Sequence, residues 1–317
     1  MRTLILNSSN ILSNTNNSIF RYNFPAGNLT FIKGQKLALA TLTMFYSTFN
    51  ITSLYGNNKI GYVWVDGTEI TYTMPDGFYD ITSFNNYLHQ QFLFNGHYLI
   101  NNDNGQVVYF ITIGANTASY TFEINCFPMD ATNYVIGVGS GTYTLGTPQP
   151  SSTAPAWVVP TGQIVPMLRI YTGQVALLGF QAGYYPQGAP TYAQAVIAGA
   201  PPAQTQTPAY TVVQTFTSSI VPQITPLSSY VLTCSLLNNN YAVPNSLLYA
   251  FAPQGVFGEQ FQLQPSGQFS FIDIQPGQYG SFTVSFLDQN LLPVAIQDPN
   301  IVILLCITDP EETVGKQ

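Results

Sequence analysis

The sequence predicts an all-β protein, a single jelly-roll β-sandwich with one short helix and a proline-rich insertion domain. Tyr and Phe, 21 of each among 317 residues, occur with abundant Thr, Val and Ile, and these residue types suit pleated, half-buried strands. The 25 Gly and 22 Pro interrupt the chain at short intervals, as turns do. Short apolar segments of strand type lie on both sides of a compositionally different middle, and their number is about that of a jelly roll, which has about eight strands.

The N-terminal part begins with a long strand, a hairpin and a helix. Residues 37–51 contain neither Gly nor Pro, and we expect a strand buried on both faces. Residues 59–74 alternate around the turn Asp66-Gly67, which predicts a hairpin. Asp80 is placed to cap a helix whose apolar residues recur at three- and four-residue steps until Asn95-Gly96. Further strands are expected at 98–100, 107–112, 119–127, 230–236, 258–263, 268–274, 281–287 and 300–307.

The middle of the chain differs in composition from both ends. Between Ala131 and Gly258 the only charged residue is Arg169, and residues 147–226 hold 12 of the 22 prolines. Proline cannot donate to a central β-ladder, so long strands are not expected here. A disordered linker and an inserted domain are the two alternatives, and the apolar runs 164–168 and 175–180 favour the insertion.

These observations divide the chain into three segments. We expect residues 1–130 to form the N-terminal part of the jelly roll, residues 131–228 an insertion domain or ordered loops, and residues 229–317 the C-terminal part of the jelly roll.

Charged residues make up 7% of the chain, against about 25% in an ordinary globular domain. Either Asn, Gln, Ser and Thr hydrate the exterior, as in secreted fibres, or neighbouring subunits cover it, and we favour assembly. The net charge of −7, with seven basic residues, argues against specific nucleic-acid binding, which needs clustered Lys and Arg.

Neither export nor a membrane span is expected. The apolar stretch Leu4–Leu6 is too short for the core of a signal peptide, and the longest apolar run, Ile301–Ile307, is far shorter than a membrane span. Cys126, Cys234 and Cys306 are odd in number and far apart in sequence, which suits reduced thiols better than a disulfide framework.

No catalytic, cofactor-binding or metal-binding residue is expected, and an enzyme is not predicted. His89 should lie on the helix surface and His97 in a loop, without the close pair of ligands that zinc sites use. The glycine-rich segment 137–141 lacks the Gly-Lys-Ser/Thr of a nucleotide loop. Arg169 is either solvated or bonded to backbone, or else it binds a ligand or a carboxylate of another subunit, and we favour the first reading.

Two aspartate pairs, Asp76 with Asp80 and Asp288 with Asp298, could in principle act as general acid and base. Asp76 and Asp298 adjoin Pro, Asp80 stands at a predicted cap and Asp288 begins the expected turn 288–290, so turn chemistry explains all four.

Three segments together resemble the penton-type minor capsid proteins of virophages and polinton-like viruses. They are MFYSTFNI (Met44–Ile51), YTMPDGFYDITSFNNYL (Tyr72–Leu88) and FTVSFLDQNLLPVAIQDPNIVILLCI (Phe282–Ile307). The resemblance implies a single jelly roll that forms a homopentamer at the icosahedral vertices of the virion, beside a major capsid protein of double jelly-roll type. It also implies assembly inside the host cell. The proline-rich middle does not share in it.

The candidate interface or core-supporting residues lie within these segments. They are Phe45, Tyr46, Phe49 and Asn50, together with Asp288, Asp298 and Pro299, which should shape a last hairpin whose second strand is central and covered on both faces. A five-fold ring needs two different complementary faces on each subunit, and neutral side chains cost less to bury than ions.

Two other functions fit the same features. One is another minor or cement capsid protein. The other is a host-binding fibre or lectin-like head, although such heads usually follow a repetitive shaft and the chain contains no internal repeat.

Overall fold

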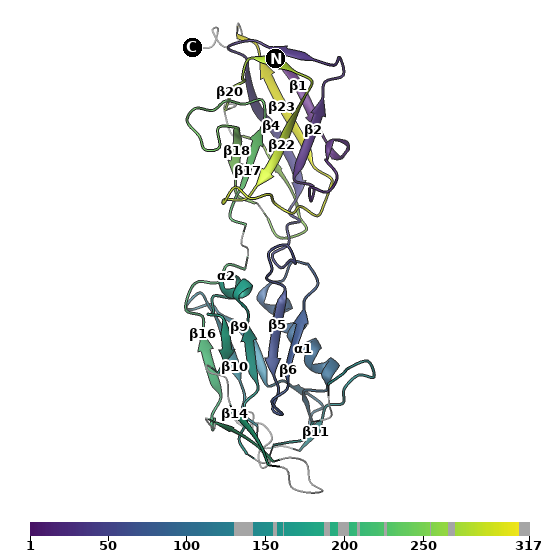
Figure 1. Cartoon of the computed structure of the whole chain (residues 1–317), viewed down its shortest axis with the longest axis vertical. Coiled ribbons are helices and arrows are strands. Elements are labelled where there is room, and N and C mark those ends of the chain that lie inside the picture. Colours follow the sequence, from purple (N-terminus) through teal and green to yellow (C-terminus); the bar gives the residue numbers. More distant parts are fainter. Residues whose placement is uncertain are drawn as a thin grey trace. The chain divides into compact units, whose positions relative to one another are not determined.

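The computed structural model describes residues 1–129, 142–154, 157–160, 162–186, 191–195, 203–207, 210–224, 227–253, 255–265 and 270–310. The chain forms two compact units. Unit 1 consists of Met1–Phe49 and Leu227–Gln317, and unit 2 of Asn50–Pro226. Both ends of the chain therefore belong to unit 1 (Figure 1).

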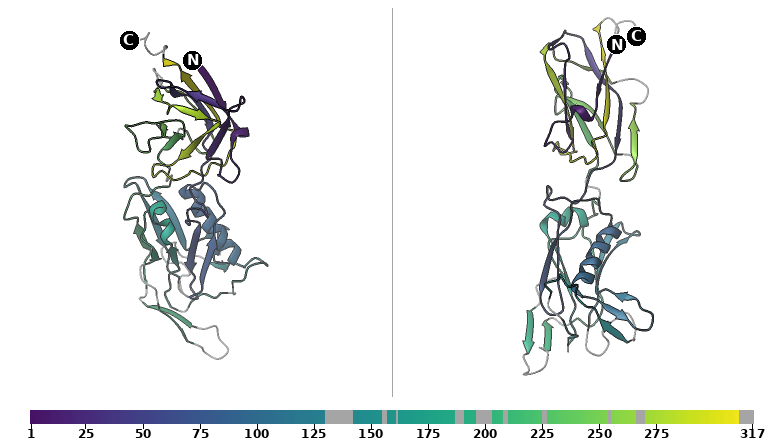
Figure 2. Two further views of the ribbon diagram at one scale, coloured as in Figure 1. Left: turned by 45° about the horizontal axis from the view of Figure 1, so that its top comes forward. Right: turned by 90° about the vertical axis from the view of Figure 1, so that its right-hand side faces the viewer.

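Two large antiparallel sheets make up most of unit 1, and they can be followed in Figures 1 and 2. The first sheet has the order β1-β23-β4-β19, with β20 also paired to β4, and the second has the order β18-β17-β22-β2. The strands are β1 (Arg2–Leu6), β2 (Ile19–Asn23), β4 (Lys36–Phe45), β17 (Tyr230–Cys234), β18 (Leu247–Phe251), β19 (Gln260–Leu263), β20 (Ile272–Asp273), β22 (Ser281–Leu287) and β23 (Val302–Thr308). Unit 1 also contains the paired strands β3 (Leu29–Phe31) and β21 (Gly277–Tyr279) and the 3-10 helix η1 (Ser8–Asn10).

The strand order of unit 1 is that of a jelly roll. When β1, β2, β4, β17, β18, β19, β22 and β23 are counted one to eight along the chain, the two sheets have the orders 1-8-3-6 and 5-4-7-2. All of these pairings are antiparallel. Two interlocked Greek keys produce this order, so the predicted single jelly roll is confirmed.

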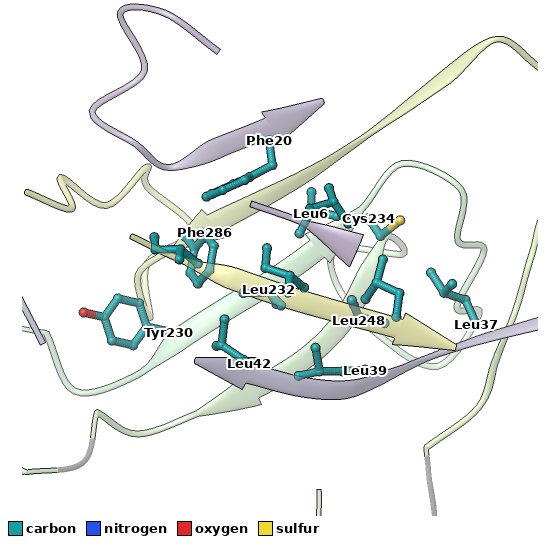
Figure 3. Close-up of a cluster of buried hydrophobic side chains, with 14 of the residues drawn as sticks. Leu6, Phe20, Leu37, Leu39, Leu42, Tyr230, Leu232, Cys234, Leu248 and Phe286 are labelled. Carbon is teal, nitrogen blue, oxygen red and sulfur yellow. The ribbon is translucent and has the colours of Figure 1, made fainter. Parts of the chain in front are cut away.

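The core of unit 1 is filled from both sheets, as Figure 3 shows. In β22, Phe282, Val284 and Phe286 are buried and alternate with the less buried Ser281, Thr283 and Ser285. In β4, Leu37, Leu39 and Leu42 are fully or almost fully buried. Successive side chains of a strand point to opposite faces, so each sheet contributes one apolar face to the sandwich.

The prediction that the last two strands form a hairpin is wrong. Strand β22 pairs with β17 and β2, whereas β23 pairs with β1 and β4, so the two strands lie in opposite sheets. The prediction that β23 is central is confirmed. Its second face is not fully covered, because Val302 is 44% exposed and Leu304 is half-buried. Alternation along one strand identifies its apolar face but does not specify which strand becomes its neighbour.

Unit 2 is also mostly β-structure, arranged in several sheets. One sheet has four strands in the order β13-β12-β5-β6, two sheets have three strands in the orders β16-β10-β9 and β11-β7-β8, and β14 pairs with β15. The elements are β5 (Lys59–Val63), β6 (Glu69–Thr73), α1 (Ile81–Asn95), β7 (Leu99–Asn101), β8 (Val107–Val108), β9 (Ile111–Asn116), β10 (Thr121–Cys126), β11 (Tyr143–Leu145), β12 (Met167–Ile170), η2 (Thr172–Gln174), α2 (Val175–Leu178), β13 (Gly183–Tyr185), β14 (Thr191–Ala195), β15 (Ala203–Thr207) and β16 (Gln214–Thr217).

Helix α1 has the ends that the sequence predicts. The Asp80 carboxylate accepts a hydrogen bond from the Ser83 amide (2.7 Å), and Gly96 adopts the left-handed conformation (φ 73°) that ends many helices. Phe84, Leu88 and Phe92 form the buried stripe of the helix, which packs beside β9.

The first unit boundary lies at Phe49 and not at residue 130. The hairpin, helix and strands between 59 and 126, expected in the jelly roll, belong to unit 2. Within unit 2, β12 pairs with β5 and β16 pairs with β10, so residues beyond 130 complete sheets that begin before it. The second boundary, at Leu227, differs from the expected one by two residues.

Candidate assembly site

Aromatic side chains gather where β4 ends. Tyr46 is buried, and Phe45 and Phe49 are half-buried. The ring of Phe257, in the loop before β19, lies 6.3 Å from that of Tyr46 and 6.1 Å from that of Phe49. Val256, next to Phe257, is exposed. Tyr46, Phe49, Val256 and Phe257 form a partly exposed apolar patch of unit 1, which we call the β4-end patch.

The segment around Asp298 is hydrogen-bonded to the same end of β4. The Asp298 amide donates to the Ser47 hydroxyl (3.0 Å), and the Gln297 amide donates to the Ser47 carbonyl (3.3 Å). The Asp298 carboxylate accepts from the Asn300 amide (2.7 Å), and Pro299 is exposed. Ser47 therefore brings two of the predicted groups, the aromatic residues of β4 and the turn at Asp298, close together.

Asp288 shapes a different turn. Its carboxylate accepts hydrogen bonds from the amides of Asn290 (2.7 Å) and Leu292 (2.8 Å). Leu291 has a positive φ of 62°, which is unfavourable for a bulky side chain, and both Leu291 and Leu292 are exposed. The carboxylates of Asp288 and Asp298 each bond the backbone of their own turn, as expected from turn chemistry.

Asn50 is the first residue of unit 2 and ties together the two ends of that unit. Its side-chain amide donates to the carbonyls of Tyr79 (2.7 Å) and Ile224 (2.6 Å), and its side-chain oxygen accepts from the Tyr79 amide (2.8 Å). The Asn57 side chain donates to the Asn50 carbonyl (2.8 Å). Asn50 is buried, and its contact with Ile224, 174 residues further along, holds the start of unit 2 beside its end.

A corresponding contact within unit 1 joins the residues that flank the inserted unit. The hydroxyl groups of Thr48 and Tyr230 are buried and lie 2.6 Å apart. Unit 1 therefore keeps the end of β4 beside the start of β17, its third and fourth strands.

His97 lies in the connection between α1 and β7, as expected of a loop histidine, but it is fully buried in unit 2. Its Nδ1 lies 2.7 Å from the Tyr62 hydroxyl, and its ring stacks on Trp64 with centroids 4.4 Å apart. Burial lowers the pKa of His97 to about 3. The long-range aromatic partners leave no periodic signal in the sequence around residue 97, so its burial could not be predicted.

His89 lies on α1 as expected, but it is partly buried. Its ring stacks on Tyr109 with centroids 3.8 Å apart, and its Nε2 lies 3.2 Å from the carbonyl of Ile111 in β9. Burial lowers the pKa of His89, and the hydrogen bond to Ile111 opposes this effect.

The expectation that Arg169 is solvated or bonded to backbone is wrong. Its guanidinium forms an ion pair with Glu69 and lies 4.7 Å and 5.2 Å from the ring centroids of Tyr171 and Tyr184. The hydrogen bond from Arg169 to Glu69 is the main cause that raises the pKa of Arg169. The Tyr184 hydroxyl donates to the second oxygen of Glu69 (3.0 Å), so the four side chains form one surface group on unit 2.

The remaining residues considered for chemistry have structural contacts. The Asp76 carboxylate accepts from the Ser53 amide (2.8 Å), and the three cysteines are buried free thiols. Burial raises the pKa of Cys126 and of Cys234 to about 12. Within the described ranges, no group of three or more His, Cys, Asp or Glu is placed to hold a metal ion, and no helix is long and apolar enough to cross a bilayer. Residues 137–141 lie outside the described residues.

Comparison with known proteins gives matches in structure alone. No protein-family model matches the chain, and no curated protein matches it in sequence. The chain is similar to the mavirus penton protein, with 11% identity, 96% of each chain covered and a TM-score of 0.39. It is also similar to a chain in a cryo-EM structure of the Sputnik virophage, with 10% identity, 99% of each chain covered and a TM-score of 0.36. The assignment of unit 1 as a jelly roll does not depend on these similarities, because it rests on the strand order of the unit.

Proposed function

We propose that the chain is a structural capsid protein, without enzymatic activity, that forms homopentamers at the icosahedral vertices of a virion. The observation that carries the proposal is the architecture of the chain. A complete eight-stranded jelly roll, a fold used by viral capsid and lectin domains, carries a second unit inserted between its third and fourth strands. The three sequence segments that resemble penton-type capsid proteins imply the same role.

The surface chemistry of unit 1 supports assembly. Tyr241 and Val243 are almost fully exposed, at 101% and 90%, in the loop between β17 and β18. The loop is held by its own backbone, where the Asn239 amide donates to the Asn245 carbonyl (2.6 Å). An ordered loop that presents Tyr and Val to water is a surface that a neighbouring subunit would cover with little loss of conformational entropy.

A head-to-tail ring needs a second, different face, and the other sheet provides a candidate. Ile5 of β1 and Val302 of β23 are exposed on the sheet with the order 1-8-3-6, whereas the loop with Tyr241 extends from the sheet with the order 5-4-7-2. The charged fraction of 7% means that few ions would lose water when such faces meet. Two unlike apolar surfaces on one subunit are what a closed heterologous interface requires.

The proposed partners and location follow from the resemblance. Beside other copies of itself, the pentamer would contact a major capsid protein of double jelly-roll type, and it would be assembled inside the host cell. The β4-end patch is the candidate surface on unit 1 that includes the predicted residues Tyr46 and Phe49.

A host-contact role for unit 2 is the second candidate function. The observation that favours it is the group of Arg169, Glu69, Tyr171 and Tyr184, because tyrosine and arginine held in place by one another are common in binding surfaces. Host contact by unit 2 is compatible with a penton role for unit 1.

Imaging of the particle that contains this chain tests the proposal. Cryo-EM reconstruction should place the jelly roll of unit 1 in density at the five-fold vertices. Density for the chain between capsomers would assign it to cement proteins, and density at the end of a fibre would assign it to a host-binding head. Either of these two results would contradict the vertex proposal.

A further inference from the structure

Both histidines of the chain form hydrogen bonds that connect α1, or the residues just after it, to neighbouring strands of unit 2. His89, within α1, bonds the carbonyl of Ile111 in β9. His97, two residues beyond the end of α1, bonds the hydroxyl of Tyr62 in β5. The chain has two histidines in all, so unit 1 contains none.

The hydrogen bonds around Tyr62 determine the tautomer and the charge of the His97 imidazole. The Tyr62 oxygen accepts from the Tyr72 hydroxyl (3.2 Å) and from the Asn95 side-chain amide (3.1 Å). Its own hydrogen is therefore donated to Nδ1 of His97, 2.7 Å away. The imidazole is then neutral, with its hydrogen on Nε2. Within the described part of the chain, neither Nε2 of His97 nor Nε1 of Trp64 has a hydrogen-bond partner.

A proton added to His97 has no favourable place in this arrangement. On Nδ1 it would point at an oxygen whose two lone pairs already accept hydrogen bonds. The resulting cation would be fully buried and stacked against Trp64. Tyr62 would also lose the acceptor for its hydrogen, so one proton disturbs both partners.

No carboxylate compensates for this cost in the described contacts. The titratable groups that face His97 are Tyr62 from β5 and, through it, Tyr72 from β6, and both are held protonated because burial raises their pKa. The charge of Asp66 acts on Tyr62, whereas desolvation is the cause of the shift of His97. His97 also lies against Trp64, and Phe92 of α1 lies against Tyr62, and neither side chain titrates.

The surroundings of His89 are similar. The titratable group that faces it is Tyr109, whose pKa is raised, mainly by burial, and the other partners are the Phe92 ring and the Ile111 carbonyl. A protonated His89 would keep its hydrogen bond to Ile111. Its charge would be less hydrated than that of an exposed histidine, and no ion pair would compensate for the lost hydration.

We propose that α1 and the two histidines form a proton-sensitive latch, which in mild acid loosens α1 from β5 and β9 while the jelly roll of unit 1 stays closed. The latch goes beyond the capsid role proposed above and does not depend on it. It gives unit 2 a response to acid that unit 1, without histidine, lacks.

The direction and size of the response follow from proton linkage. Histidine in an opened chain titrates near 6.5, whereas in the closed unit the pKa of His97 is lowered to about 3 and that of His89 is lowered as well. The opened state therefore binds protons that the closed state does not, so the closed state loses its advantage as pH falls below about 6.5. At pH 5, His97 alone shifts the equilibrium about 30-fold toward opening. Carboxyl groups ordinarily titrate near pH 4, below the pH of 5 at which this shift is given.

Hydrogen exchange of the full chain at pH 7.5 and pH 5.0, corrected for intrinsic rates, tests the latch. The protection of amides in α1 and β5 should fall about 30-fold or more, and that of β22 and β23 should stay unchanged. Tryptophan fluorescence provides a second readout, because both tryptophans, Trp64 and Trp157, lie in unit 2.

The variant that should abolish the response combines His89→Gln with His97→Asn. Gln keeps a donor for the Ile111 carbonyl, and Asn keeps an acceptor for the Tyr62 hydroxyl, but neither side chain takes up a proton. The matched control is Asp103→Asn, which removes an exposed carboxylate of unit 2 and should respond like the wild type. A double variant with the wild-type pH dependence, or an equal loss of protection in β22 and β23, would overturn the proposal.

A measurement on the wild type covers the case in which the double variant does not fold. NMR titration of the two imidazole C–H signals in the folded chain should show no midpoint above pH 5 for His97 and a midpoint below 6.5 for His89. A midpoint near 6.5 for His97 in the closed state would contradict the latch.

Discussion

Single buried polar residues carry much of the specificity of this chain. Asn50 makes three side-chain hydrogen bonds to backbone groups that lie 29 and 174 residues away in sequence. No apolar residue of the same size can replace these bonds, which hold the start of unit 2 beside its end.

The substitution Asn50→Ala should destabilise unit 2 by about 2–3 kcal/mol, because it leaves the partly buried backbone groups of Tyr79 and Ile224 without these partners. Thermal unfolding followed by tryptophan fluorescence reports on unit 2. The control Asn86→Ala, at an exposed position of α1, should change stability by less than about 0.5 kcal/mol. Equal melting temperatures for the two variants would show that the tie at Asn50 does not stabilise the unit.

For single residues, the sequence predicts local contacts better than distant ones. The roles of Asp80 and Asp288 follow from neighbours within four positions, and they were predicted as caps and turns. The burial of His97 depends on Tyr62 and Trp64, more than 30 residues earlier, and the partner of Arg169 is 100 residues earlier. Sequence spacing carries no information on such pairs.

Among the elements, β23 is the one whose loss should harm unit 1 most. It lies between β1 and β4, and Ile303, Leu305 and Ile307 are buried on its inner face. Removing the strand would expose the ladders of both neighbours and several aliphatic side chains.

Two adjacent substitutions test the orientation of β23. Ile303→Ala should cost about 2–5 kcal/mol, because the side chain is fully buried and its removal leaves a cavity. Val302→Ala, on the 44% exposed outer face, should cost less than about 1 kcal/mol. Chemical denaturation followed by circular dichroism measures both. If the two substitutions cost the same, the assigned face of β23 is wrong.

A pair of truncations tests the strand as a whole. A chain that ends after Pro310 keeps Asp309, whose carboxylate accepts from the Gln35 side chain (2.7 Å), and should remain soluble. A chain that ends after Pro299 lacks β23 and should be insoluble, since the buried side chains it loses are worth about 1.5–3 kcal/mol each against a total of about 5–15 kcal/mol. Similar soluble yields for the two chains would argue against a central β23.

Elements with strong local signals were predicted closely, and others were missed. The expected strand 281–287 coincides with β22, and α1 begins and ends where its caps predict. Strands β1, β2 and β18 were not predicted. Each is only five residues long, lies near Asn, Ser or Pro in the sequence, and forms a strand because it pairs with its neighbours in the sheet.

For the whole molecule, the jelly roll and, to within two residues, the start of its C-terminal part were predicted, but the end of its N-terminal part was not. The alternating pattern of β5 and β6 resembles that of the jelly-roll strands, so residues 59–126 were assigned to the wrong unit. Alternation identifies a half-buried strand in any sheet, whereas the division into units depends on pairings such as β12 with β5.

Replacing unit 2, residues 50–226, by a short Gly/Ser linker should leave a soluble jelly roll. All eight strands and their core lie in unit 1, and the contact between Thr48 and Tyr230 holds the flanking residues together. Deleting only 131–228 should instead expose the core of unit 2, because it removes β12 and β13 from the sheet of β5. Soluble yield and circular dichroism of the two variants provide the comparison. An insoluble product from the complete replacement would mean that unit 1 does not fold alone.

The proposed ring of five subunits predicts a definite mass for the native assembly. The mass of the native assembly, measured by light scattering on the purified full chain and by mass determination of the capsomer released from the particle, tests it most directly. A pentamer should appear as a stable species of five times the 34.7 kDa chain, held by neutral, apolar surfaces and therefore little affected by salt. A stable trimer, or a chain that remains monomeric in the particle, would contradict it.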